Sequence, residues 1–248
     1  MTDFAEIDRA AKRPVDIWTN YFYYWFSLRF VYLIRKTGIT PNQVTLMSFA
    51  LLLAAAVCFA DGTRAAILLG LVFHQASFVL DCADGQLARY KKLFTPFGAW
   101  LDQTTDRVKE FLIVFSLAAG YARWHFDMDG VWKLALIALF VVYLLEYYEQ
   151  QRGRLKTEAP ADLPLAFTGA PAGAGVGNVL RWLRAARQYI PFRGFTIGEQ
   201  YFLVGVLLLF ADAKTALAAV AWVGLAMAVY HPFATLAKTY IHRGGRIV

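Results

Sequence analysis

Long apolar stretches with few charges run through most of this chain, and they restrict its possible folds more than any other feature. A helix needs about 20 apolar residues to cross the ~30 Å hydrocarbon core of a membrane, and several stretches reach that length. Composition agrees, because 58% of the 248 residues are hydrophobic and only 17% are charged. The mean hydropathy is +0.43. The chain is therefore predicted to be an all-α, polytopic integral membrane protein.

The apolar stretches predict six transmembrane helices, and local capping patterns mark some of their starts. Thr40 followed by Pro41 is typical of an N-cap and a first helical residue, and Thr196 with Glu199 fits a capping box. The second and third helices are longer than a bilayer needs, so their ends should project from it. The six predicted spans cover residues 42–60, 63–91, 96–122, 131–151, 196–211 and 214–242.

Two segments are predicted to lie outside the bilayer core. Residues 15–37 are crowded with aromatic side chains and carry Arg29 in their middle, which indicates an N-terminal amphipathic helix at the membrane interface. Residues 152–195 form a long linker with a Gly-rich middle, and its stretch 179–190 has the pattern of a surface-lying helix. The whole chain, 1–248, is interpreted as a single membrane domain.

Basic residues are distributed unevenly between the two predicted sides of the membrane. The formal net charge is +7, and most Lys and Arg fall on one side. The positive-inside rule then places both termini, the segment 1–38 and the linker 152–195 in the cytoplasm. Because the cations follow the predicted membrane surface, we expect binding to membrane lipids and not to nucleic acid.

Four aspartates lie inside otherwise apolar sequence, on the second and third predicted spans. Asp81 and Asp84 are three residues apart on one span. Asp102 and Asp106 are four residues apart on the next, so each pair shares a helix face. A short connection near residues 93–95 joins the two helices. The four carboxylates are therefore predicted to meet at one depth, at the cytoplasmic side.

Carboxylates at membrane depth are costly, so this group needs a partner. Protonation or cations must relieve their mutual repulsion, and oxygen ligands without His or Cys favour Mg²⁺, Mn²⁺ or Ca²⁺ over Zn²⁺. Gly85, Ala88 and Gly98 leave helix surfaces bare for a flat ligand, and Arg89 offers a forked donor for phosphate oxygens. Divalent cations used in phosphate chemistry are favoured. A cation-binding or transport protein, and aspartates that only cap helices, remain alternatives.

These residues carry a resemblance to a known family. Their pattern is Asp81-x2-Asp84-Gly85-x2-Ala88-Arg89-x8-Gly98-x3-Asp102-x3-Asp106. It resembles the motif of the CDP-alcohol phosphotransferases, also called CDP-alcohol phosphatidyltransferases, at all eight positions and with the same spacing. The opening Pro41-Asn42-x-x-Thr45 is also similar to the start of the first span in many members. The resemblance is specific over about residues 40–110.

The resemblance implies an enzyme with six helices around a cytoplasmic cavity, commonly a homodimer, whose catalytic helices here span 42–122. It implies two divalent cations, Mg²⁺ or Mn²⁺, bridging a CDP pyrophosphate and held by Asp81, Asp84, Asp102 and Asp106. It implies nucleotide contacts from Gly85, Ala88, Arg89 and Gly98, helped by Asn42 and Thr45. Asp106 is the implied general base, which takes a proton from an acceptor hydroxyl before CMP leaves.

The donor and the acceptor are less defined by the sequence. The favoured version moves a phosphatidyl group from CDP-diacylglycerol to a polar acceptor, and a soluble donor of the CDP-inositol or CDP-choline type is the alternative. Asp106-Arg107 resembles members that use inositol phosphate. A phosphorylated acceptor needs a basic lining, for which the candidates are Arg107, Lys109, Arg152 and Arg154.

Overall fold

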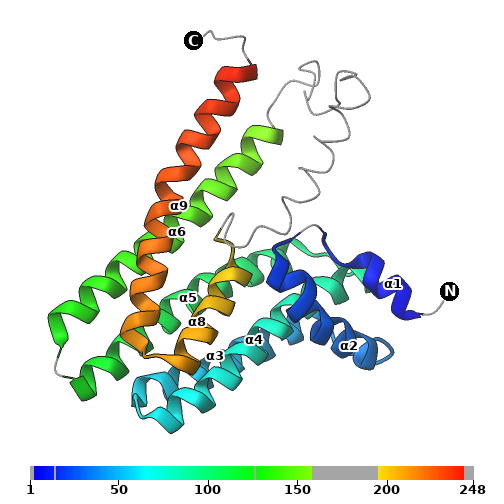
Figure 1. The fold of residues 1–248 in the computed structure, drawn as a ribbon. Helices are drawn as coiled ribbons and strands as arrows, with labels where there is room; N and C mark the ends of the chain where they lie inside the picture. The colour runs from blue at the N-terminus through cyan, green and yellow to red at the C-terminus, as the bar shows by residue number, and fades with distance from the viewer. Residues whose placement is uncertain (1–2, 14, 126, 158–194, 243–248) are drawn as a thin grey trace.

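The protein is all-helical over the residues that its structure, a computed structural model, describes. These residues are 3–13, 15–125, 127–157 and 195–242, with the side chains of 152–157 and 237–242 excepted. Every element within them is a helix, which confirms the all-α part of the predicted fold class (Figure 1). The elements are α1 (Asp3–Ala10), the π-helix η1 (Thr19–Tyr23), α2 (Tyr24–Ile34), α3 (Pro41–Asp61), α4 (Arg64–Lys91), α5 (Pro96–His125), α6 (Met128–Thr157), α8 (Ile197–Phe210) and α9 (Ala213–His242).

Each of the six predicted spans corresponds to one helix, but the helices differ in whether their length and composition suit a membrane span. The four helices α3, α4, α6 and α9 are long and apolar enough to do so. Helix α5 is not among them, since it carries both Asp102 and Asp106 and the charged run that begins at Arg107. Helix α8 has only 14 residues, a length of about 21 Å. The described residues therefore contain four clear candidate spans, as expected of an integral membrane protein.

Local capping sets several helix ends as the sequence predicts. The Thr40 hydroxyl accepts a hydrogen bond from the Gln43 N–H at 3.3 Å, and the Gln43 side chain accepts from the Thr40 N–H at 2.9 Å. The same exchange begins α8, where Glu199 accepts from the Thr196 N–H at 3.0 Å. Between α3 and α4, Gly62 has a φ of +80°, a left-handed conformation that suits a residue without a Cβ. The chain can therefore reverse tightly there.

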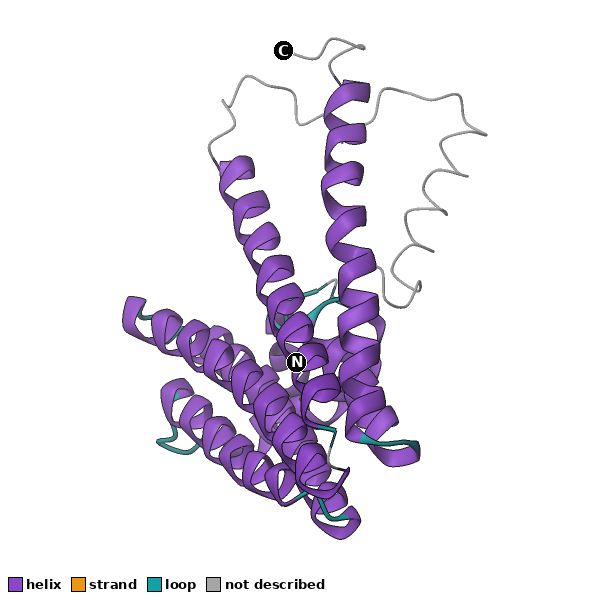
Figure 2. Ribbon diagram, turned by 90° about the vertical axis from the view of Figure 1, so that its left-hand side faces the viewer, coloured by secondary structure: helices purple, strands orange, loops and turns teal. Residues whose placement is uncertain are grey.

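Helix α3 is the central packing element for the helices that carry the aspartates. It packs along both α4 and α5, whereas α4 and α5 make little backbone contact with each other. Buried hydroxyls join α3 to α4, because Ser77 donates to the Ser48 carbonyl at 2.8 Å. Helices α6 and α9 run side by side and project away from this group (Figures 1 and 2). Side chains of α4 and α5 can thus meet across the space between them.

The N-terminal segment docks on α4 and α8. Residues 15–37 were expected to form one amphipathic helix, but they contain the π-helical turn η1 followed by α2. The Trp18 ring stacks on Phe202 with 3.6 Å between centroids. The Tyr23 hydroxyl donates to the Gln75 side chain at 2.6 Å. Helix α1 was not predicted. It packs against α2 and α4 with Ile7 buried, so it belongs to the packed part of the fold.

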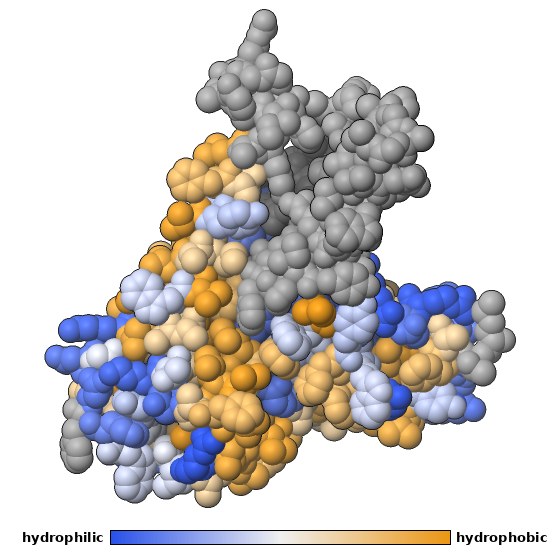
Figure 3. Space-filling view, in the orientation of Figure 1, coloured by the Kyte–Doolittle hydropathy of each residue, from blue (hydrophilic) through white to orange (hydrophobic). Residues whose placement is uncertain are grey.

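The surface has the polarity of a protein embedded in a membrane. On the face shown in Figure 3, hydrophobic residues fill the middle, over α8 and α9. Hydrophilic residues gather over α1 at one end and near the junction of α5 and α6 at the other. The predicted linker begins as a helix, since α6 continues to Thr157. Its remainder, with the surface helix expected at 179–190, lies outside the described residues.

Candidate metal centre

Three of the four aspartates meet between α4 and α5. Asp81 lies in the C-terminal half of α4, and Asp102 and Asp106 lie in the N-terminal half of α5. Each offers a carboxylate oxygen, and these oxygens all lie within 4.8 Å of one another. All three residues are half-buried, so they remain open to a ligand. The helical spacing predicted that all four aspartates would meet, and three of them do so.

A turn at the end of α4 brings the two helices together. Lys92 adopts a left-handed conformation with φ of 56° and ends α4. The Leu93 N–H then donates to the Ala88 carbonyl at 2.9 Å, which closes the last turn of the helix. Helix α5 begins only a few residues later, at Pro96. The short connection therefore positions the start of α5 against the end of α4.

Asp84 is placed differently from the other three aspartates. It is only 5% exposed, and its Oδ2 accepts a hydrogen bond of 2.6 Å from the hydroxyl of Thr45 on α3. Thr45 is itself 3% exposed. The sequence treated the four carboxylates as equivalent, but the structure separates a group of three from one that is held by α3. A hydroxyl five residues after the helix N-cap Thr40 gives no sequence indication of this long-range contact.

The ammonium group of Lys109 lies within the carboxylate group. Lys109 is 2% exposed, and its Nζ donates to Asp81 Oδ1 and, at 3.2 Å, to Asp106 Oδ1. The sequence named Lys109 as a candidate for acceptor binding. Its spacing of three from Asp106 does place the two side chains on one helix face, but the contact with Asp81 needed the structure. In this arrangement one ammonium bridges carboxylates of α4 and α5.

The donor set fits a hard divalent cation. Three carboxylates converge, and neither His nor Cys belongs to the group that the described residues form. Mg²⁺ and Mn²⁺ are bound in proteins mainly by such oxygen ligands. The residues present are therefore compatible with the predicted metal site, and Asp81, Asp102 and Asp106 are the ones that would hold an ion.

The residues expected to contact a nucleotide lie beside the carboxylates. The Arg89 guanidinium folds back over Gly85, where a Cβ would stand 3.3 Å from Nη1, and its Nε donates to the Ala10 carbonyl at 2.5 Å. A Cβ on Gly98 would lie 2.8 Å from Asn42 Oδ1. Both glycines are therefore places of close approach. Ala88, half-buried, lies one residue before Arg89 on α4.

The expected acceptor cations are only partly described. The Arg107 guanidinium forms ion pairs with Glu110 Oε2 at 2.7 Å and with Glu146 Oε2 at 3.8 Å. The contact with Glu110 does not have the geometry of a hydrogen bond. The Tyr143 hydroxyl donates to the Arg107 carbonyl at 3.0 Å. Arg152 and Arg154 follow on α6, and their side chains lie outside the described residues. Arg107 is thus already held by two acids from α5 and α6.

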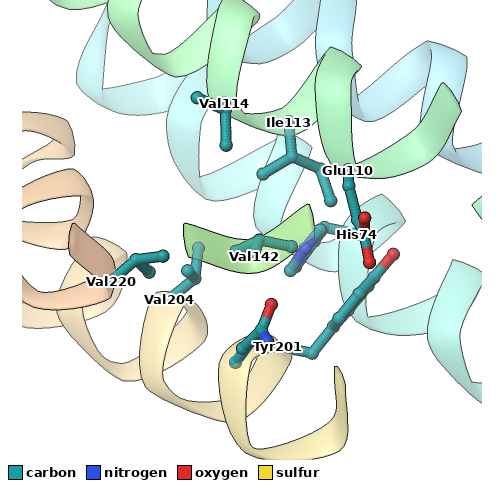
Figure 4. A pocket seen from close by; sticks show the side chains of 9 residues that line it. His74, Glu110, Ile113, Val114, Val142, Tyr201, Val204 and Val220 are labelled. Carbon is teal, nitrogen blue, oxygen red and sulfur yellow. The ribbon is translucent and has the colours of Figure 1, made fainter. Parts of the chain in front are cut away.

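An apolar pocket lies one helical turn beyond Asp106, among α4, α5, α6, α8 and α9. One of its polar members, His74, is 1% exposed and stacks on Tyr201 at 4.2 Å between centroids. His74 is therefore a core residue. Figure 4 shows His74, Glu110 and Tyr201 on one side and valines on the other. The lining residues are His74, Glu110, Ile113, Val114, Val142, Gln200, Tyr201, Val204 and Val220.

The chain is similar in sequence to one protein family and to several named proteins. The family model described as CDP-alcohol phosphatidyltransferase matches residues 38–230. The chain is 40% identical over 110 residues to an archaetidylinositol phosphate synthase of Pyrococcus horikoshii, covering 44% of this chain and 54% of that protein. It is 35% identical over 120 residues to a bifunctional IPC transferase and DIPP synthase of Aquifex aeolicus, covering 48% and 26%. The chain thus spans about half and about a quarter of these two relatives.

A further relative is covered over most of its length. The chain is 32% identical over 169 residues to a phosphatidylinositol phosphate synthase of Corynebacterium glutamicum, covering 62% of this chain and 74% of that protein. Among solved structures, the phosphatidylinositol phosphate synthase of Mycobacterium tuberculosis with CDP-DAG bound has a TM-score of 0.57 at 18% identity, covering 84% and 92%. The same enzyme with manganese and citrate has a TM-score of 0.54 at 19% identity, covering 84% and 87%. These likenesses show a shared fold.

Proposed function

The chain belongs to the CDP-alcohol phosphatidyltransferase family, and we propose that it is a metal-dependent enzyme of that chemistry. It transfers a substituted phosphate group from a CDP-alcohol to the hydroxyl of a polar acceptor, with release of CMP. The observation that carries the proposal is the convergence of Asp81, Asp102 and Asp106 within 4.8 Å, on helices that also carry the family's full motif. A binding or transport protein would not need that motif.

Divalent cations, bound by the aspartates, would neutralise charge on the donor's pyrophosphate and fix its orientation. Asp106 accepts the proton of the acceptor hydroxyl, whose oxygen then forms a bond to the phosphorus distal to cytidine. The bond between that phosphorus and the bridging oxygen breaks, and CMP leaves with the oxygen. Asp84 completes the ligand set in this proposal, and its hydrogen bond to Thr45 holds it in one rotamer.

The nucleotide is proposed to lie along the bare helix surfaces at Gly85, Ala88 and Gly98. Arg89 contributes guanidinium donors to phosphate oxygens, and its Nε bond to the Ala10 carbonyl limits its movement. Asn42 supports this site from α3, since its amide oxygen approaches Gly98. Close backbone approach is the property that these small residues share, and it favours a ligand lying flat on the helices.

We propose CDP-diacylglycerol as the donor and inositol phosphate as the acceptor. Support comes from the relatives, which are named as phosphatidylinositol phosphate and archaetidylinositol phosphate synthases, and from a related fold with CDP-DAG bound. Arg107, Lys109, Arg152 and Arg154 are the proposed cations for the acceptor's phosphate. Release of Arg107 from Glu146, at 3.8 Å the longer of its two ion pairs, would free one edge of its guanidinium for that phosphate.

The proposed membrane arrangement extends the four clear spans to six by adding α5 and α8. The charged side chains of α5 face other protein groups, which supports its placement in the interior of the bundle. Segment 15–37 lies at the interface, where the Arg29 guanidinium covers the Trp25 ring at 3.7 Å. The basic side, with both termini and the active site, is cytoplasmic, the chain is one domain, and the enzyme is a homodimer.

The test is an assay of CMP release by the purified protein with Mg²⁺ or Mn²⁺. Donors are CDP-diacylglycerol, CDP-inositol and CDP-choline, each combined with inositol phosphate and other polar acceptors. We expect release only with metal and fastest with CDP-diacylglycerol. The Asp106→Asn variant is expected to lose about 10²–10⁴-fold in rate, the usual contribution of a general base.

A measurement of metal affinity in Asp106→Asn distinguishes the role of Asp106 as a general base from its role as a metal ligand. Asp81 and Asp102 remain in Asp106→Asn, so its affinity for Mn²⁺ should fall far less than its rate. Failure of every donor with every acceptor would refute the enzyme assignment and favour a cation-binding protein. Metal-dependent CMP release at the wild-type rate in Asp106→Asn would instead refute the proposed role of Asp106 alone.

A further inference from the structure

The ammonium of Lys109 lies among the carboxylates that are proposed to bind divalent cations. Its Nζ contacts oxygens of both Asp81 and Asp106, two of the three carboxylates that converge within 4.8 Å. The side chain is 2% exposed, so it is not a surface lysine that happens to lie near. A divalent cation that binds these carboxylates would compete with the ammonium for the same oxygens and would repel its positive charge.

The other basic side chains described near the centre are held elsewhere. Arg89 donates its Nε to the Ala10 carbonyl, and Arg107 is paired with Glu110 and Glu146. Among the described residues, the ion pairs to Asp81 and Asp106 both come from Lys109. Three carboxylates this close repel one another strongly unless a cation lies among them. Lys109 therefore supplies the positive charge that allows the group to converge without metal.

The position of Lys109 also allows it to withdraw. It lies on α5, three residues after Asp106, so its backbone stays fixed beside the site while its four-carbon stem can swing. A compact ammonium on a flexible stem differs in this from a guanidinium, which binds carboxylates in a rigid fork. Its two partners belong to different helices, so the contact also joins α4 to α5, which make little backbone contact of their own.

We propose that Lys109 is a built-in counter-cation of the carboxylate group, which occupies the site in the metal-free protein and is displaced by an incoming divalent cation. Lys109 then sets the metal affinity, because each binding event has to break its two ion pairs. Its ion pairs also hold α4 and α5 together before the metal binds. This inference rests on the proposed function only in that the aspartates bind a divalent cation.

The test measures Mn²⁺ binding without substrate, on the purified full chain after treatment with a chelator. Calorimetry or the EPR signal of free Mn²⁺ gives the dissociation constant for wild type, Lys109→Met and Lys109→Arg. Removing a unit positive charge about 4 Å from the site should tighten binding about 10- to 100-fold in Lys109→Met, less than the bare Coulomb term because the ammonium can swing away. Lys109→Arg, which keeps the charge, should not show this gain. Lys133→Met, an exposed site on α6, controls for net charge.

Thermal unfolding provides a second readout. Metal-free Lys109→Met should unfold at a lower temperature than wild type, and Mn²⁺ should raise its Tm by more. If the variant can be purified only with Mn²⁺ present, the cation has replaced the ammonium, as proposed. If it fails to fold in both conditions, Lys109→Gln takes its place in the same titration with the same expected gain.

The direction of the affinity change decides between counter-cation and scaffold. A purely structural Lys109 would leave the aspartates misplaced when it is removed, and Mn²⁺ binding would weaken. Equal or weaker binding by folded Lys109→Met or Lys109→Gln therefore overturns the inference. If wild type itself binds no Mn²⁺, the proposed metal site is wrong. If wild type binds and the variants bind no tighter, only the counter-cation is wrong.

Discussion

Loss of the Thr45 hydroxyl should destabilise the protein through Asp84. The hydroxyl donates to Asp84 Oδ2 at 2.6 Å, and the two residues are 3% and 5% exposed. Water therefore cannot easily replace the donor. Thr45→Val keeps the shape of the side chain but leaves a buried carboxylate without this hydrogen bond, which joins residues 39 positions apart on α3 and α4.

The size of the effect follows from the charge and the burial of the acceptor. A hydrogen bond to a charged group contributes about 1.5–3 kcal/mol to stability. For a chain of this length, 1 kcal/mol corresponds to about 2–4 °C in Tm, so a loss near 2 kcal/mol predicts a fall of about 4–8 °C. Thr45→Ser keeps the hydroxyl and should stay closer to wild type.

The assay is thermal unfolding in detergent of wild type, Thr45→Val, Asp84→Asn and the double variant. If the two residues act through their hydrogen bond, Thr45→Val should cost less when Asp84 is already Asn, and the difference is the coupling energy. Additive costs, or a Tm for Thr45→Val equal to that of wild type, would refute this account of how Asp84 is held.

Other predictions concern the glycine and the histidine beside the site. Gly98→Ala would place a Cβ 2.8 Å from Asn42 Oδ1, so we expect a cost of about 1–3 kcal/mol in stability and a higher KM for the CDP-donor. Gly38→Ala, where a Cβ would meet nothing within 4 Å, is the control, and equal effects in both would contradict the packing argument. His74→Phe should keep CMP release near wild type, because His74 packs in the core against Tyr201; loss of release in a folded variant would assign it a catalytic role.

Much of the fold follows from patterns that are local in sequence. The helix bounds at 41–61, 64–91 and 96–125 follow from apolar runs, capping by Thr40 and the positive-φ residue Gly62. These depend on neighbours within a few residues, so a sequence suffices to predict them. The N-terminal helices were predicted less well, since α1 is polar and is held by contacts to distant parts of the chain. Local patterns are weak evidence where tertiary contacts decide.

The candidate site divides in the same way. Spacing alone placed Asp102 and Asp106 on one face, and the convergence with Asp81 followed once two helices were joined by a short turn. The separate environment of Asp84 did not follow. It depends on α3, which packs on both α4 and α5 and supplies a hydroxyl that no spacing rule connects to an aspartate 39 residues later.

Apolar length and helical periodicity are properties of consecutive residues, so the class of molecule, the family motif and the helix faces that carry charges can be predicted without a structure. Which charges are partners cannot be predicted in this way. The sequence made Lys109 one of several candidate cations, and the structure shows its Nζ in contact with Asp81 and Asp106. It also shows that the Arg89 Nε donates to the Ala10 carbonyl. An ion pair depends on distance in space, and that distance is set by how the helices pack.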